Sequence, residues 1–209
     1  LDEGGKADAD HAIFRSPPAA GEARVICFAP DHGATLARLP VDAIARVVDC
    51  WAGLSAEMGE KWAHVQLFEN KGAMMGASSP HPHGQVWASD FVPELPAKED
   101  LRQREWLAAH GTCLLDAVAD AEIASGERVV EVNGDWIAFV PFWAAWPFET
   151  MVLPLAPAAR LEELEPARRR SLAALLSRLL RRYDGLFACD FPHSMGWHGA
   201  PHAPGDDTA

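Results

Sequence analysis

The pentapeptide His81-Pro82-His83-Gly84-Gln85 places two imidazoles and one carboxamide at alternate positions of the chain. Residues two apart in an extended strand point to the same face, so His81, His83 and Gln85 are expected to line one side of a strand edge. A neutral imidazole can attack phosphorus and form a phosphoramidate if its attacking nitrogen carries no proton. The other ring nitrogen then holds the proton, and we expect it to donate to a nearby backbone carbonyl.

Two other interpretations of this histidine pair stay open at this point. The His-Pro-His sequence is compatible with a turn that carries two surface histidines. Histidines two residues apart on a strand can also share a metal ion. The preceding loop adds Gly72 and Gly76, which allow unusual backbone dihedral angles, and Ser78 and Ser79, which add hydroxyl donors. Such a loop could cradle a diphosphate through its N–H groups.

The rest of the chain predicts short strands and amphipathic helices that would position these groups. Hydrophobic periodicity and turn residues predict strands over residues 24–28, 64–68, 85–91, 128–132, 136–140 and 150–155. The same signals predict helices over 41–58 and around Leu172 to Tyr183, and a helical stretch over 101–124 that Gly111 weakens. Loops are predicted over 70–79 and 93–100. Asn133-Gly134 between two strand runs indicates a β-hairpin. The aromatic residues Trp87, Phe142, Trp143, Trp146 and Phe148 are interpreted as core.

One strand–loop–helix–strand pattern occurs twice. Residues 25–30 precede Leu39-Pro40 and an amphipathic helix, and residues 151–157 precede Leu164, Pro166 and a second such helix. Two copies of one unit would pack as a duplicated α+β domain. Coincidence is the alternative, because the identities between the two copies are few.

Bulk composition limits the functional class. The chain has 209 residues, 49% of them apolar and 23% charged, with a formal net charge of −12. An acidic protein repels a nucleic-acid backbone, so no nucleic-acid partner is expected, although a small anionic ligand remains compatible. The sequence contains no apolar run long enough for a membrane span and no visible signal peptide. Its four scattered cysteines favour a reducing cytoplasm.

The segment from Phe68 through Trp87 resembles the active-site signature of the galactose-1-phosphate uridylyltransferases, a family of the histidine-triad superfamily. Three further strings carry the resemblance in the same order: RVICFAPDH at 24–32, VPFWAAWPFE at 140–149 and FPHSMGWHGAP at 191–201. The resemblance spans roughly residues 13 to 201 and implies a chain truncated at both ends. It also implies duplicated histidine-triad-like units, with an antiparallel half-barrel sheet and amphipathic helices packed on it.

This resemblance gives expected boundaries and roles. We expect a partly disordered segment at 1–22, a first unit with the active-site motif at 23–125, and a second, incomplete unit at 126–209. His83 corresponds to the uridylylated nucleophile, and Gln85 to the glutamine that hydrogen-bonds the transferring phosphoryl group. The positions that correspond to contacts of the UDP-sugar are Asn70, Gly76, Ala77, Ser78 and Gln85. Ala77 departs from the cysteine common there, so any side-chain contribution at that position is lost.

The resemblance further implies two metal sites, both incomplete. His32 and His81 correspond to two ligands of a structural zinc, whose other ligands come from an N-terminal C-x-x-C that this chain lacks. Glu99 and His198 correspond to two ligands of a second metal, iron or zinc, which also uses a downstream His-x-His. A closed zinc site needs four ligands, so two histidines alone would bind zinc weakly.

The expected activity is the exchange of UMP between UDP-glucose and galactose-1-phosphate in galactose metabolism, in a cytoplasmic homodimer. Glutamine at position 85 cannot transfer protons near neutral pH, which favours transfer over hydrolysis. One alternative is a related transferase or phosphorylase that acts on another sugar nucleotide, such as ADP-glucose. The other is a folded fragment without activity.

Overall fold

The computed structural model describes residues 18–202. Its strands are β1 (Gly21–Cys27), β2 (His64–Lys71), β3 (His83–Ser89), β4 (Val129–Val132), β5 (Trp136–Phe139), β6 (Met151–Pro154) and β7 (His193–Trp197). Its α-helices are α1 (Val41–Gly59), α2 (Glu94–His110), α3 (Leu114–Ser125) and α4 (Pro166–Leu186), joined by the 3-10 turns η1 (Leu36–Arg38), η2 (Ala73–Met75) and η3 (Leu161–Glu163). Most of the predicted segment 1–22 lies outside the described residues.

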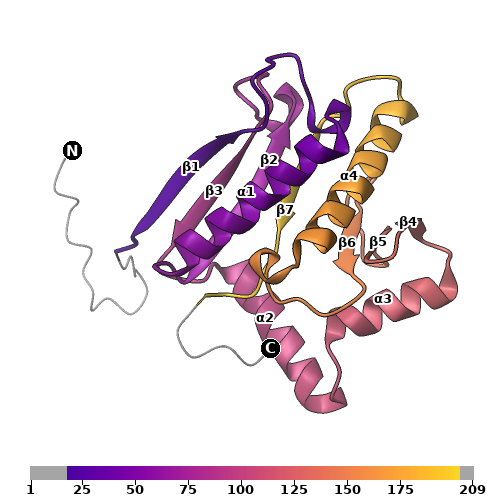
Figure 1. Ribbon diagram of the computed structural model, residues 1–209. Helices are drawn as coiled ribbons and strands as arrows, with labels where there is room; N and C mark the ends of the chain where they lie inside the picture. The colour runs from indigo at the N-terminus through magenta and orange to yellow at the C-terminus, as the bar shows by residue number, and fades with distance from the viewer. Residues whose placement is uncertain (1–17, 203–209) are drawn as a thin grey trace.

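The strands form two antiparallel sheets, one in the order β1-β3-β2-β7 and the other in the order β4-β5-β6. Helices α1 and α4 lie side by side over one face of the sheets, while α2 and α3 project below them (Figure 1). The chain is therefore a mixed α+β fold with antiparallel sheets, as predicted. Antiparallel sheets commonly pack one face on the core and leave the other accessible, and here α1 and α4 cover the same face.

Helix α1 supplies much of the core because its apolar residues recur at helical spacing. Ile44, Val48, Trp51 and Met58 are almost fully buried against the sheet. Burying one such side chain stabilises the fold by roughly 1.5–3 kcal/mol. Trp51 packs edge-on against Phe28 with the ring centroids 5.6 Å apart, so the residue that follows β1 packs against α1.

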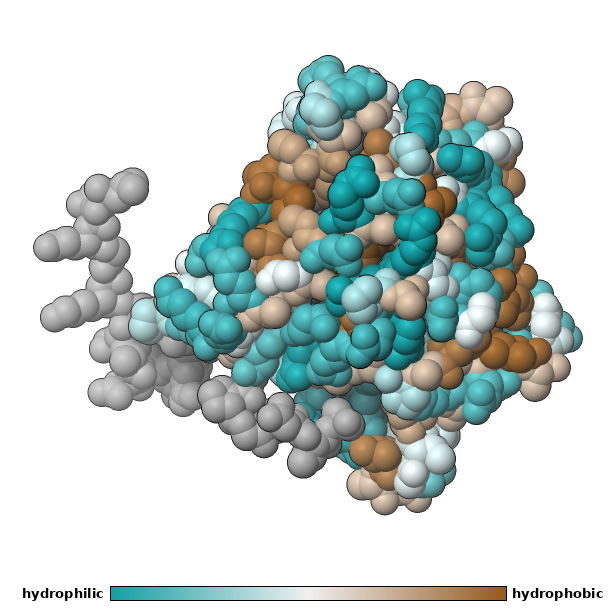
Figure 2. Space-filling model, viewed as in Figure 1, coloured by the Kyte–Doolittle hydropathy of each residue, from teal (hydrophilic) through white to brown (hydrophobic). Residues whose placement is uncertain are grey.

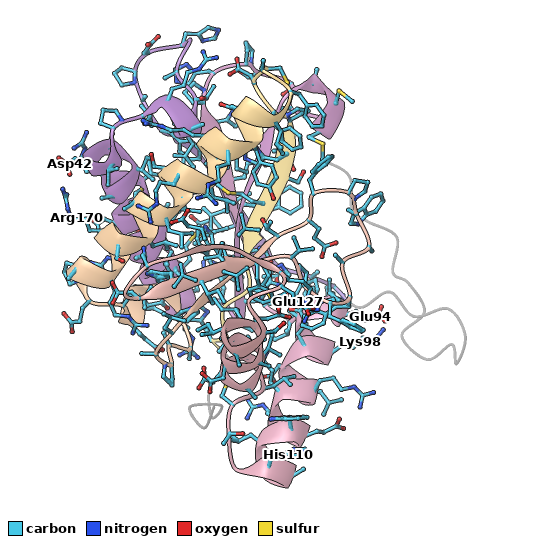
Figure 3. The ribbon with its side chains drawn as sticks, turned by 90° about the vertical axis from the view of Figure 1, so that its right-hand side faces the viewer. Asp42, Glu94, Lys98, His110, Glu127 and Arg170 are labelled. Atoms are coloured by element: carbon cyan, nitrogen blue, oxygen red, sulfur yellow. The ribbon has the colours of Figure 1, made fainter. Side chains whose placement is uncertain are left out.

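Helices α1 and α4 are also joined at their solvent edge by ion pairs. Arg169 donates to Asp49 at 2.6 Å, and Arg170 pairs with Asp42. Figure 3 shows Asp42 and Arg170 labelled at the surface of the two helices. Exposed pairs of this kind contribute little stability, so the buried leucines of α4 are what hold the helices together. The helix-covered face is mostly hydrophilic on its outside (Figure 2).

The predicted hairpin at Asn133-Gly134 is confirmed, since β4 and β5 pair around it. The Asn133 side-chain oxygen accepts hydrogen bonds from the N–H groups of Asp135 at 3.0 Å and Trp136 at 2.9 Å. Its amide nitrogen donates to the Ser171 carbonyl at 3.0 Å. Asn133 thus shapes the turn and also ties the second sheet to α4.

The helical stretch predicted over 101–124 is divided at Gly111, the residue expected to weaken it, into α2 and α3. Gly111 adopts a φ of 71° and ends α2, with its N–H donating to the Leu107 carbonyl at 2.8 Å. Such a left-handed glycine is a common helix C-cap. The predicted loop at 93–100 was wrong, because α2 already begins at Glu94.

The interpretation of the aromatic residues as core was wrong as well. Trp87 is 57% exposed, Phe142 80% and Trp146 77%, and Trp143 and Phe148 are exposed too. The Glu149 carboxylate accepts hydrogen bonds from the N–H groups of Ala145 and Trp146, at 2.8 and 3.1 Å, so a side chain within the loop stabilises it while these rings stay exposed. Among residues 18–202, no helix has the length and hydropathy that crossing a bilayer requires.

Candidate active site

The side chains of β3 alternate between the core and the opposite, helix-free face of the sheet. Val86 and Ala88 are buried, whereas His83 and Gln85 are partly exposed and Trp87 is exposed. Antiparallel partners place further side chains on this face, since Phe68 lies opposite Gln85. The prediction that His83 and Gln85 share a face is confirmed, and the face is accessible. His81 was predicted on the same strand face, but it precedes β3, and its ring lies against His32.

Gly84, next to His83, allows β3 to lie close to the Phe68 backbone and the Phe28 ring. A Cβ atom at this position would lie 2.9 Å from the Phe68 carbonyl oxygen and 2.9 Å from the Phe28 ring. Both distances are well below ordinary van der Waals contact, so any larger side chain would push the strands apart. The absence of a side chain at Gly84 therefore fixes the position from which His83 projects.

A backbone hydrogen bond determines the tautomer of His83. Its Nδ1 lies 2.7 Å from the His81 carbonyl oxygen. A carbonyl can only accept, so Nδ1 carries a proton, and in the neutral ring Nε2 therefore keeps its lone pair. The expectation that the second nitrogen donates to a backbone carbonyl is thus confirmed. The ring is held with its unprotonated nitrogen available, which is the form that a nucleophile needs.

Asn70, near the end of β2, belongs to the same face as Gln85. It lies opposite Ser194 of β7 in the strand register, and the Ser194 hydroxyl donates to the Asn70 side-chain oxygen at 2.5 Å. The amide nitrogen of Asn70 is then the group that faces away from the serine. Two strands from distant parts of the sequence thus meet at this position.

The glycine loop closes on itself through backbone hydrogen bonds. Gly72 has a φ of 92° and Gly76 a φ of 80°, conformations that favour glycine. The N–H groups of residues 75–77, including Ala77, bond to the carbonyls of Gly72 and Ala73. These donors are engaged within the loop, so an anion here would be met by hydroxyls such as that of Ser78.

The structure brings together the first pair of predicted metal ligands. The Nδ1 atoms of His32 and His81 are 3.1 Å apart. Two nitrogens bound to one tetrahedral zinc would be about 3.4 Å apart, so this spacing fits half of such a site. Within residues 18–202, no group of three or more His, Cys, Asp or Glu could hold a metal ion, so the described residues do not complete a site.

The second predicted pair also meets, because α2 carries its Glu99 side chain to the end of β7. His198 Nδ1 lies 2.8 Å from a Glu99 carboxylate oxygen. Sequence reasoning overlooked their neighbour His64, which is only 4% exposed and whose Nε2 has no hydrogen-bond partner. Burial lowers the pKa of His64, and the nearby His202 and His198 lower it further. Nothing in the spacing of the sequence indicated that His64 would lie in this group.

Comparison with known proteins agrees with this geometry. The family model for the N-terminal domain of galactose-1-phosphate uridyl transferase matches residues 2–93, and the model for the C-terminal domain matches residues 99–209. The chain belongs to the galactose-1-phosphate uridyl transferase family. The expected resemblance is thereby confirmed over nearly the whole chain.

Similar members of this uridyl transferase family span a longer sequence. The galactose-1-phosphate uridylyltransferase of Haemophilus influenzae is 48% identical over 90% of this chain and 54% of its own length. That of Rattus norvegicus is 47% identical over 92% of this chain and 51% of its own. A solved uridylyltransferase structure superposes with a TM-score of 0.81 at 30% identity, covering 86% of this chain and 57% of that one. The chain thus spans about half the length of the curated relatives.

Proposed function

We propose that this chain transfers UMP between UDP-glucose and galactose-1-phosphate, with His83 as the nucleophile. The main supporting observation is the hydrogen bond from His83 Nδ1 to the His81 carbonyl, which in the neutral ring leaves Nε2 unprotonated on an accessible face. The names of the similar proteins from Haemophilus influenzae and Rattus norvegicus support the choice of sugar phosphate. The family membership supports the class of reaction.

The proposed reaction has two displacements at one phosphorus. His83 Nε2 attacks the α-phosphorus of UDP-glucose, an N–P bond forms, and the P–O bond to glucose-1-phosphate breaks. A phosphate oxygen of galactose-1-phosphate then attacks the same phosphorus, the N–P bond breaks, and UDP-galactose leaves. The imidazole gains positive charge in the intermediate, and the His81 carbonyl stabilises it through the retained Nδ1–H.

Gln85 and Ser78 would stabilise the negative charge on the phosphoryl oxygens. An amide can donate a hydrogen bond to those oxygens but cannot take a proton from water near neutral pH. The uridylyl group would therefore wait for a sugar phosphate rather than react with an activated water. Asn70, Gly76 and Ala77 would lie along the bound sugar nucleotide.

We propose that His32 and His81 are two ligands of a structural zinc. The 3.1 Å spacing of their Nδ1 atoms supports this assignment. Glu99 and His198 would be two ligands of a second metal, iron or zinc, supported by their contact at 2.8 Å. Such ions would stabilise the fold around the site, and the remaining ligands would come from outside residues 18–202.

We also propose that units 23–125 and 126–209 are two histidine-triad-like copies that together form a half-barrel. The order β1–η1–α1–β2 matches the order β6–η3–α4–β7. The residue before each 3-10 turn is extended, with φ −133° at Thr35 and −142° at Arg160, and Leu39 and Leu164 follow with ψ 146° and 132°. A cytoplasmic location is supported by four free cysteines, and the homodimer rests on the family resemblance alone.

Mass spectrometry after incubation with UDP-glucose tests the proposed activity. The chain should gain one UMP on His83, the increment should be lost in acid, and galactose-1-phosphate should remove it. His83→Ala should abolish it, whereas His110→Ala, at the far end of α2 (Figure 3), should not. Labelling that persists in His83→Ala would refute the assignment of His83 as the nucleophile. A parallel incubation with ADP-glucose tests the alternative that the enzyme uses an adenine nucleotide. If neither donor forms an adduct, the alternative of a folded fragment without activity is favoured.

A further inference from the structure

Trp87 makes a hydrogen bond whose direction is unambiguous. Its indole Nε1 lies 3.2 Å from the Gln85 side-chain oxygen. An indole N–H can only donate, so the Gln85 oxygen must face Trp87. The amide NH₂ of Gln85, with its two donors, is consequently turned to the opposite side of the carboxamide.

The position of Trp87 is difficult to explain by packing alone. The side chain is 57% exposed and lies on the same face of β3 as His83 and Gln85. It is nevertheless oriented, because the Phe68 ring meets it edge-on with centroids 5.5 Å apart. Phe68 also lies opposite Gln85 in the strand register, so one residue of β2 is a neighbour of both Gln85 and Trp87.

The second carboxamide on this face is arranged in the same way. The Ser194 hydroxyl donates to the Asn70 oxygen at 2.5 Å, and this leaves the Asn70 NH₂ as the outward group. Each amide therefore has its acceptor atom engaged by a protein donor. This face therefore presents N–H donors to an anion, while the amide oxygens, which would repel an anion, are turned toward protein donors.

We propose that Trp87 is a positioning residue that fixes the orientation of the Gln85 carboxamide. In this orientation the NH₂ group of Gln85 faces the phosphoryl oxygens at His83. This inference rests on the proposed function and adds to it a residue with a defined task. Without the indole donor the carboxamide can turn by half a rotation, and its oxygen then faces the anionic phosphoryl group. The loss concerns the transition state more than ground-state binding, because negative charge on those oxygens is best matched by donors that are already oriented.

A double-mutant cycle of Trp87→Phe and Gln85→Ala tests the proposal. Phenylalanine keeps an aromatic ring against Phe68 but removes the N–H donor. The rate constant of UMP adduct formation from UDP-glucose should fall about 3- to 10-fold in Trp87→Phe, as expected for one lost hydrogen bond. The half-saturating UDP-glucose concentration should change less. In the Gln85→Ala background the additional Trp87→Phe change should have no further effect.

Trp143→Phe is the matched control, since Trp143 is also an exposed tryptophan but lies in the loop after β5. It should react at the wild-type rate. The proposal is overturned if Trp87→Phe is as fast as the wild type. It is also overturned if that change slows Gln85→Ala as much as it slows the wild type, because Trp87 would then act without Gln85.

A second measurement separates this inference from the proposed function. Hydrogen exchange of the Trp87 indole N–H, followed by NMR, reports the contact without any reaction. Gln85→Ala should accelerate this exchange severalfold, while the indole of Trp143 stays unchanged. An unchanged Trp87 exchange rate would refute the positioning role. If the wild-type chain forms no adduct but Gln85→Ala still accelerates exchange of the Trp87 indole N–H, only the transferase activity is refuted.

Discussion

Gly84→Ala places the smallest possible side chain at the tightest backbone contact of the site. The new Cβ would lie 2.9 Å from the Phe68 carbonyl oxygen, which belongs to the β2 backbone and cannot rotate away. It would also lie 2.9 Å from the Phe28 ring, which is itself packed edge-on against Trp51. Relief therefore requires β3 to move away from β2, and His83 moves with it.

The cost of this substitution can be estimated from overpacking. Extra atoms in a well-packed core typically cost about 1–3 kcal/mol, and replacing glycine in a strand returns roughly 0.5–1 kcal/mol. The net loss should be about 1–2 kcal/mol. For a chain of 209 residues this corresponds to a fall in Tm of roughly 2–8 °C.

Urea unfolding followed by circular dichroism measures the loss, with the midpoint falling and the slope unchanged. Adduct formation on His83 should slow by at least about tenfold, because small misplacements at a reacting centre are costly. Gly134→Ala is the control, since a Cβ there meets nothing within 4 Å. A Gly84→Ala chain with the wild-type midpoint and wild-type adduct rate would refute the reasoning that this contact is tight and that it positions His83.

Three further predictions concern stability. In α1, Gly53→Ala should stabilise the chain by about 0.5–1 kcal/mol in urea unfolding, because the added Cβ meets nothing. Gly59→Ala in the same helix should destabilise the chain, because that Cβ would collide with the His202 ring. Changes of the same sign in the free energy of unfolding of the two variants would contradict this packing. Burial lowers the pKa of His64, so the unfolded state binds its proton first as the pH falls. Stability should then drop below about pH 6.5 by up to roughly 1.4 kcal/mol per pH unit until the folded state is also protonated, and His64→Gln should reduce this slope. Asn133→Ala removes three hydrogen bonds and should cost about 2 kcal/mol in thermal unfolding, whereas a cost near zero would mean that the hairpin does not need its side chain.

Local patterns predicted the elements and part of the site correctly. The apolar spacing from Val41 predicted α1, and Asn133-Gly134 predicted the hairpin. The period of two placed His83 and Gln85 on one face, and the need for one unprotonated nitrogen predicted the hydrogen bond from the other to a backbone carbonyl. Each of these features depends on residues within a few positions of one another, where backbone geometry alone constrains the outcome.

Other features depend on which elements pack together, and no local pattern indicates them. Trp87 was interpreted as core because large aromatic residues usually are, yet the helices cover only the opposite face of its sheet. His64 is another example, because the fold buries it near His198 and Glu99, each more than thirty positions away in the sequence. Helix α2 was partly predicted as a loop, because its residues remain largely accessible and carry no clear apolar stripe.

The sequence by itself determined that His83 and Gln85 alternate on a strand beside a glycine loop, because side-chain direction follows from the strand period. Tertiary structure decided that this face stays open while the other is covered by α1 and α4. It also decided that Trp87 and Ser194 reach the oxygen atoms of Gln85 and Asn70. The physical reason is that periodicity fixes which side chains point the same way, whereas burial and hydrogen-bond partners depend on the segments that arrive from elsewhere in the chain.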